Sequence, residues 1–122
     1  DNFWMGFTAE TQETYTRRLR DSVDIDACNK FVSLEPIQGP IRITAEVVPN
    51  WIIVGQESGT RKERVKTSIE WINNIVGDCK ERRIPVYVKS NIPGEWPKEF
   101  PESLINPASS HTPAIQQGTK DK

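Results

Sequence analysis

Four short apolar runs, each ending in a charged residue, constrain the fold of this chain more than any other feature of its sequence. Three runs end in a glutamate, at Glu10, Glu35 and Glu57, and the fourth ends in Lys89. Side chains in a β-strand alternate between two faces, so each run can be divided by counting back from its terminal charge. The pattern predicts four strands whose faces follow one rule.

The two predicted faces differ in the same way in all four runs. One face is almost wholly apolar and collects Met5, Phe7, Ala9, Val32, Leu34, Ile52, Val54, Gln56, Val86 and Val88. The other face is large or apolar early in each run and small, hydroxylic or charged late. If the strands are parallel, the charged ends meet at the edge where α/β folds place ligand sites. The candidate substrate- or cofactor-facing residues are therefore Thr8, Glu10, Ser33, Glu35, Ile53, Gly55, Glu57 and Lys89.

Two helical patterns separate these runs. The first extends from Thr11 to about Val23, with Tyr15 and Leu19 on one face and Thr8 or Thr11 as its cap. The second extends from about residue 61 or 62 to residue 82, with Ser58 or Thr60 as its cap. Its apolar stripe, spaced by three and four residues, comprises Val65, Ile69, Ile72, Val76 and Cys79.

The order strand, helix, strand, crossover, strand, helix, strand predicts an α/β fold. Right-handed crossovers between parallel strands place the helices on one side of a curling sheet. Because one strand face turns polar towards its end, like the interior of a barrel, we predict half of a TIM-type barrel with about four parallel strands and two main helices. This domain covers residues 1–97, and residues 98–122 form an irregular, mobile tail. A half barrel exposes two strand edges, so we expect self-association or pairing with a separate amino-terminal half.

Composition excludes several classes of protein. The chain has 122 residues, enough for one domain, and 16 basic against 17 acidic residues give a net charge of -1, which favours neither nucleic acid nor an anionic membrane. Cys28 and Cys79 lack metal-ligand spacing and indicate a reduced, cytoplasmic protein. No apolar run approaches the roughly 20 residues that span a bilayer. The start at Asp1 suggests a fragment or a processed product.

Four segments, taken in order, resemble strands in the carboxy-terminal half of a phage-associated protein family of unknown function related to the radical S-adenosylmethionine enzymes. The segments are residues 4–10, residues 31–36 with Gly39 and Pro40, residues 51–59, and residues 86–89. Residues 94–96 resemble the segment that follows the last strand of that family. The resemblance covers about residues 3 to 97.

The resemblance implies a barrel whose amino-terminal half holds an iron–sulfur cluster on three cysteines and cleaves S-adenosylmethionine. Two cysteines cannot supply three thiolate ligands, so we expect no activity from this chain alone, and expect both cofactors only together with an amino-terminal half. Ile53 and Gly55 fit the Ile-x-Gly core that lies along the adenine in such barrels. The implied role is a pocket wall with substrate contacts. The alternative is a non-catalytic, oligomerising scaffold or interaction module.

Each candidate site also has a simpler interpretation. The three glutamates are either ligand-facing carboxylates or solvated residues at strand exits, and Lys89 either binds an anion or forms a structural salt bridge. Residues 55–60 lead into the second helix, and a tight turn is favoured there over an anion-binding loop. His111 lies in the predicted tail, where solvent exposure is favoured over catalysis, so no histidine-based triad or zinc site is expected.

Overall fold

A computed structural model describes residues 4–24, 29–44, 48–56 and 67–102. This part of the chain contains four strands and two α-helices, and a short 3₁₀ turn follows the first helix. In chain order they are β1 (Trp4–Thr8), α1 (Gln12–Asp21), the 3₁₀ turn η1 (Ser22–Asp24), β2 (Asn29–Leu34), β3 (Trp51–Val54), α2 (Ile69–Arg82) and β4 (Val86–Val88).

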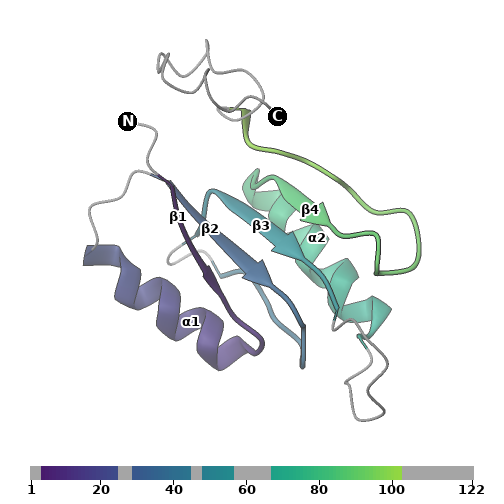
Figure 1. Ribbon diagram of the computed structural model, residues 1–122, viewed down its shortest axis with the longest axis horizontal. Coiled ribbons are helices and arrows are strands. Elements are labelled where there is room, and N and C mark those ends of the chain that lie inside the picture. Colours follow the sequence, from purple (N-terminus) through teal and green to yellow (C-terminus); the bar gives the residue numbers. More distant parts are fainter. Residues whose placement is uncertain (1–3, 25–28, 45–47, 57–66, 103–122) are drawn as a thin grey trace.

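The strands form one parallel sheet in the order β1-β2-β3-β4 (Figure 1). The register aligns Phe7 with Val32, Val32 with Ile52, and Ile52 with Val86. The predicted α/β fold with four parallel strands and two helices is therefore confirmed. Because all strands run the same way, their carboxyl ends meet at one edge of the sheet.

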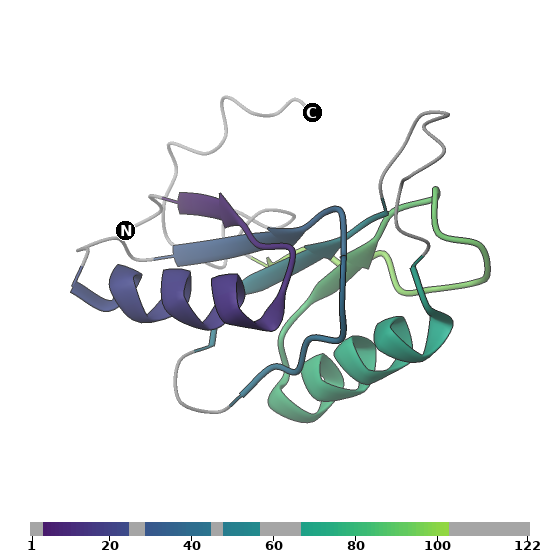
Figure 2. The ribbon, with the colours of Figure 1, turned by 90° about the horizontal axis from the view of Figure 1, so that it is seen from below.

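Both helices cover the same face of the sheet (Figure 2). That face carries two buried aliphatic side chains from each of β2, β3 and β4, namely Val32, Leu34, Ile52, Val54, Val86 and Val88. The intervening residues on the opposite face, including Phe31, Ser33 and Ile53, are only half-buried. The alternation predicted by counting back from the terminal charges is thus present in the folded chain.

Helix α1 begins where the sequence places a cap. The Thr11 hydroxyl accepts a hydrogen bond from the Thr14 backbone N–H, and the Thr14 hydroxyl accepts one from the Thr11 N–H at 3.1 Å. This reciprocal arrangement satisfies two N–H groups that the first helical turn leaves free. Tyr15 and Leu19 are buried, as their spacing predicts. Burial raises the pKa of the Tyr15 hydroxyl, so this phenol stays protonated.

Helix α2 differs from its prediction in start and in orientation. It begins at Ile69, after Ser68, whose hydroxyl accepts from the Glu70 N–H at 3.2 Å. The predicted caps and Val65 lie outside the described residues. Ile69 is 46% exposed, and Ile75 replaces Val76 as a fully buried residue. The predicted stripe was therefore wrong at Ile69 and did not include Ile75, whereas Val76 packs against the core as predicted.

A buried carboxylate accounts for the orientation of α2. Asp78 faces the core side of the helix and accepts two hydrogen bonds from the Arg42 guanidinium, both at 2.8 Å, and one from the Ile43 N–H at 3.0 Å. The Arg42 guanidinium holds the pKa of Asp78 below its ordinary value, and the Ile43 N–H adds to this effect. Holding Asp78 inward brings Ile75 and Cys79 inward on the same side of the helix.

The connection from β2 to β3 fills the space between the two helices. Its side chains Ile37, Ile41 and Ile43 are buried. The Gln12 side chain of α1 accepts from the Arg42 backbone N–H at 2.6 Å and donates to the Arg42 carbonyl at 3.2 Å. This irregular segment therefore takes the place of a third helix, and Arg42 links it to both neighbouring helices. Its Glu35–Pro36 peptide bond is cis.

Residues 97–99 run antiparallel to the outer edge of β4. The Val88 N–H donates to Pro97 O at 2.9 Å, and the Glu99 N–H donates to Val86 O at 3.0 Å. A β-bridge joins Lys98 to Tyr87, and Pro101 is buried. Chain packing against the sheet thus continues beyond β4 through Pro101.

Candidate functional site

The polar ends of the strands meet at the carboxyl edge of the sheet, on the face that the helices leave uncovered. Glu35 follows β2 and Lys89 follows β4, and the Lys89 Nζ lies 2.8 Å from a Glu35 carboxylate oxygen. The Glu35 side chain is 28% exposed and that of Lys89 is 45% exposed. This ion pair spans β3, which lies between the two strands. The structure therefore brings together two of the candidate site residues.

Gly55 makes this ion pair geometrically feasible. A Cβ atom at residue 55 would lie 3.0 Å from the Glu35 Cδ and 3.2 Å from its Cγ, tighter than ordinary contact. The Glu35 side chain thus lies across the Gly55 backbone on its way to Lys89. The Gly55 N–H in turn donates to Leu34 O at 3.1 Å, which fixes this residue beside the end of β2.

Thr8, Ser33 and Ile53 occupy one row across the first three strands. The register pairs Thr8 with Ser33 and Ser33 with Ile53, and the row ends at Tyr87. Thr8 is exposed, whereas the other members are half-buried. This row lies one step below the Glu35–Lys89 pair on the same face, so these candidates do share a surface.

The remaining two candidates are less closely connected to the ion pair. The Glu10 backbone N–H donates to the Thr14 hydroxyl at 3.2 Å, and its carbonyl accepts from the Gln38 N–H at 3.0 Å. Both bonds hold the turn into α1. Glu57 lies outside the described residues, so its predicted place at this edge is not tested.

Five aromatic side chains form a floor below the polar edge on the same face. We call this group, Trp4, Phe31, Trp51, Tyr87 and Phe100, the aromatic floor. Ring centroids lie 5.3 to 6.4 Å apart from one neighbour to the next, distances at which tilted aromatic pairs attract. Phe31 lies over Gly6, where an added Cβ would be 2.1 Å from its Cζ. The uncovered face is therefore aromatic at one end of the strands and polar at the other.

Sequence reasoning missed two contacts at this site. Gln56 and Asn91 bond to each other at the carboxyl edge, with the Asn91 amide donating to Gln56 O at 2.9 Å and the Gln56 N–H donating to the Asn91 side chain at 3.4 Å. Arg18 of α1 donates to the Thr8 carbonyl and approaches its hydroxyl at 3.4 Å. Neither contact follows from strand parity, because Asn91 comes from a loop and Arg18 from a helix.

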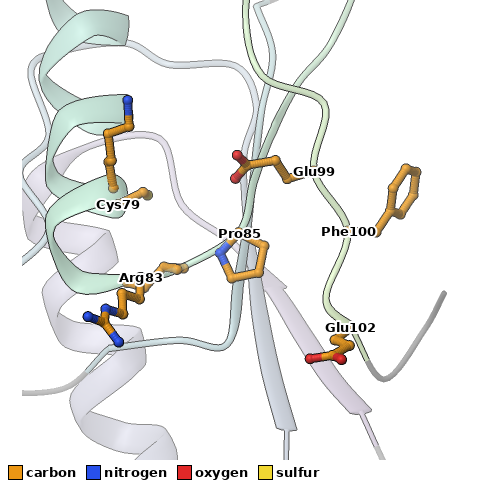
Figure 3. A pocket seen from close by; sticks show the side chains of 8 residues that line it. Cys79, Arg83, Pro85, Glu99, Phe100 and Glu102 are labelled. Carbon is orange, nitrogen blue, oxygen red and sulfur yellow. The ribbon is translucent and has the colours of Figure 1, made fainter. Parts of the chain in front are cut away.

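A concave region lies at the other end of the sheet from the Glu35–Lys89 pair (Figure 3). This hollow of about 420 Å³ lies between the end of α2 and residues 99–102. It is lined by Cys79, Lys80, Arg83, Ile84, Pro85, Glu99, Phe100 and Glu102. Burial raises the pKa of the Cys79 thiol to about 12, so it stays protonated and is a poor nucleophile at neutral pH. The Cys79 thiol is therefore a poor candidate for a nucleophile in this hollow.

Metal ligation finds no support within the described ranges. No group of three His, Cys, Asp or Glu side chains there lies close enough together to hold a metal ion. The described part of the chain also contains no helix with the length and apolar character needed to cross a membrane.

The sequence profile of the family described as "Protein of unknown function (DUF5131)" matches residues 1–119. No curated protein and no solved structure matches the chain.

Proposed function

We propose that this chain, which belongs to the DUF5131 family of proteins of unknown function, forms the carboxy-terminal portion of a barrel like those of the radical S-adenosylmethionine enzymes, of phage or mobile-element origin. In this role it supplies a pocket wall and substrate contacts. The reaction itself belongs to a complete barrel, which this chain forms only with further strands.

The observation that carries the proposal is the division of the sheet into two unlike faces. Both helices lie on the aliphatic face, as they do on the outside of a barrel (Figure 2). The uncovered face has the aromatic floor at the amino ends of the strands and Glu35 with Lys89 at the carboxyl ends. Barrel enzymes bind ligands at the carboxyl ends of their strands, and side chains fill the interior below.

The Glu35–Lys89 pair is the proposed contact with substrate. Both side chains are partly exposed at the polar edge, so a charged ligand group can replace either partner. The Thr8 and Ser33 hydroxyls on the same face offer neutral hydrogen bonds one row below. In this arrangement Gly55 acts by leaving room for Glu35, and Ile53 contributes apolar wall.

The iron–sulfur cluster does not fit this chain. Cys79 is buried and protonated, and no metal-ligating group of three is present in the described segments. The cluster and the S-adenosylmethionine site would then belong to a separate amino-terminal half-barrel in the cytoplasm, and the other proposed partner is a second copy of the chain.

Reconstitution with a companion chain tests this function. A polypeptide encoded beside this chain and carrying a three-cysteine cluster is co-purified with it, loaded with iron and sulfide, and titrated with S-adenosylmethionine by calorimetry. We expect binding by the complex and none by either chain alone. Lys89→Gln should weaken binding or turnover of the complex, whereas Lys80→Gln, at the opposite end of the sheet, should not. A complex that binds with unchanged affinity and turnover in both variants would contradict the proposed role of the polar edge.

The second candidate function is a non-catalytic, oligomerising scaffold. It is favoured by the structural salt bridge that Lys89 forms with Glu35 and by the aromatic floor, whose partly exposed rings another chain could cover. Under this function the companion complex forms, or the chain self-associates, but S-adenosylmethionine does not bind.

A further inference from the structure

The outer edge of β1 carries backbone groups that face away from the sheet. The Ala9 N–H donates to Ser33 O at 3.0 Å, so Ala9 and every second residue before it, Phe7 and Met5, direct their backbone groups towards β2. Trp4, Gly6 and Thr8 therefore direct theirs outward. Among the described residues, the only partner of these outward groups is Arg18, which binds the Thr8 carbonyl.

The outer edge of β4 is closed by comparison. Its outward groups belong to Val86 and Val88, and all four are bonded. Val86 donates to the Glu99 carboxylate at 3.1 Å and accepts from the Glu99 N–H, while Val88 donates to Pro97 O and accepts from the Lys98 ammonium. Two copies therefore cannot close into one barrel through β4–β1 pairing unless residues 97–99 leave the sheet.

We propose that β1 is the self-association edge of this chain, and that its occupant is β1 of a second copy in antiparallel orientation, centred on Gly6. In this register Gly6 lies opposite Gly6 of the second copy, and Trp4 lies opposite Thr8. The outward N–H and C=O groups of these residues then bond in closely spaced pairs, as antiparallel strands require. This inference rests on the self-association proposed above and deepens it by naming the edge and the register through which a second copy pairs.

Self-complementarity is the reason that a second copy fits this edge. The residue on the two-fold axis, Gly6, has no side chain to collide with its counterpart, and the largest side chain, Trp4, meets the small Thr8. On the helix-covered face Met5 lies opposite Phe7, which is an apolar pair. With β4 closed, the described residues of each copy offer one edge, so pairing through them stops at a closed dimer rather than a fibre.

Arg18 opposes this pairing. Its guanidinium holds the Thr8 carbonyl, which must accept from the Trp4 N–H of the second copy in the proposed dimer. Charged side chains that cover an edge in this way reduce strand addition. Removing Arg18 should therefore strengthen association, whereas blocking the edge backbone should weaken it. A residue with a purely structural role has no reason to strengthen a dimer when it is removed.

Analytical ultracentrifugation of three variants up to about 1 mM tests the sign of both effects. We expect Arg18→Ala to tighten the dimer by about tenfold, since the competing bond is lost in both copies. Thr8→Pro removes an outward N–H and spares the bonds to β2. This variant should weaken the dimer by at least a similar factor. Arg17→Ala, whose partner is Glu13 on the exposed side of α1, should leave the dimer unchanged. If the wild type and Arg18→Ala are both monomeric at the highest concentration, the proposal is wrong.

Cross-linking tests the register and does not depend on the Thr8→Pro variant folding. Met5→Cys and Phe7→Cys chains are prepared separately in a Cys28→Ser background and then mixed under mild oxidation. We expect a disulfide-linked dimer from the mixture and little from either chain alone, because residue 5 faces residue 7 only across the two-fold axis. Equal cross-linking in all three samples, or a link from β1 to β4 of the second copy, would overturn the proposed pairing.

Discussion

The two outer edges of the sheet are covered by very different means. At β4, residues 97–99 bond all four outward backbone groups of Val86 and Val88. At β1, three residues direct their backbone outward, and one arginine side chain binds one of the carbonyls in the described structure. A strand edge that is paired by its own chain is closed to other chains, whereas an edge guarded by one side chain opens when that side chain moves.

This difference changes what the half-barrel prediction implies. The sequence suggested two exposed edges, and a two-copy barrel would use both. The structure leaves β1 as the edge available for strand pairing among the described residues. A companion half-barrel and a second copy therefore compete for the same edge, and the following substitutions separate effects on the whole domain from effects on each edge.

Asp78→Ala should have the largest effect on the free energy of unfolding and should affect both edges of the sheet equally. Asp78 is 6% exposed and ties α2 to the β2–β3 connection, so its loss leaves the Ile43 N–H without its acceptor and should lower the free energy of unfolding by about 3 kcal/mol. Urea unfolding measures this loss, and hydrogen exchange should accelerate equally at Phe7 and at Val88. Faster exchange at only one of the two strands would contradict a role for Asp78 in the whole domain.

The same carboxylate predicts how stability depends on acid pH. The pKa of Asp78 is lowered in the folded chain, so its contribution is fully present above the ordinary value near 3.9 and is lost as the pH falls through the folded pKa. The urea concentration at the unfolding midpoint of the wild type should therefore decrease as the pH is lowered below about 4. Asp78→Asn, which cannot ionise, should show a shallower fall over that window.

Gly6→Val should have the next largest effect and should act at β1. The new side chain would overlap Phe31, whose ring packs between Trp4 and Trp51, so we expect a loss of about 2 kcal/mol from overpacking. Thermal unfolding measures the loss. The matched control is Gly39→Ala, where an added Cβ meets no atom within 4 Å. Equal stability of Gly6→Val and the wild type would show that Phe31 can leave Gly6 freely.

Phe100→Ala should have a smaller effect, confined to the β4 side. The Phe100 ring lies 5.7 Å from Trp51 and 5.3 Å from Tyr87, but it is 46% exposed, so we expect a loss of about 1 kcal/mol. Hydrogen exchange should accelerate at Val88 and stay unchanged at Phe7. Val48→Ala removes another exposed apolar side chain and serves as control. Matching acceleration at Phe7 would mean that the aromatic floor joins the two edges energetically.

Local patterns in the sequence predicted the strands, their shared parity and two candidate caps, Thr8 and Thr11, of which Thr11 is the cap, because each depends on neighbours a few residues away. Parity also placed Glu35 and Lys89 on one surface, although it left a salt bridge and a ligand contact as equal alternatives. The orientation of α2 was not predictable in this way. It depends on Arg42, which lies 36 residues before Asp78 and has no periodic relation to it.

The cover on β4 was missed for a similar reason. Two prolines, Pro97 and Pro101, flank a polar segment that lacks strand alternation, so the sequence there favours an irregular loop. The segment pairs with β4 because the Pro97 carbonyl can accept a hydrogen bond although proline has no N–H to donate. The side chains of Lys98 and Glu99 complete the pairing. Such a mixed edge has no sequence signature of a strand.

Glu99→Ala should have the smallest effect on stability and the most local effect on exchange. The Glu99 carboxylate accepts from the Val86 N–H, so its removal should cost about 1 kcal/mol and accelerate exchange of the Val86 amide, while the backbone bonds of residues 97–99 hold Val88 in place. Glu99→Gln keeps an acceptor oxygen and should preserve protection of Val86. Glu102→Ala, which lines the same hollow, controls for loss of charge there. If Glu99→Ala leaves Val86 exchange unchanged, the backbone of residues 97–99 alone closes β4; if exchange also rises at Val88, the carboxylate holds the whole segment in place.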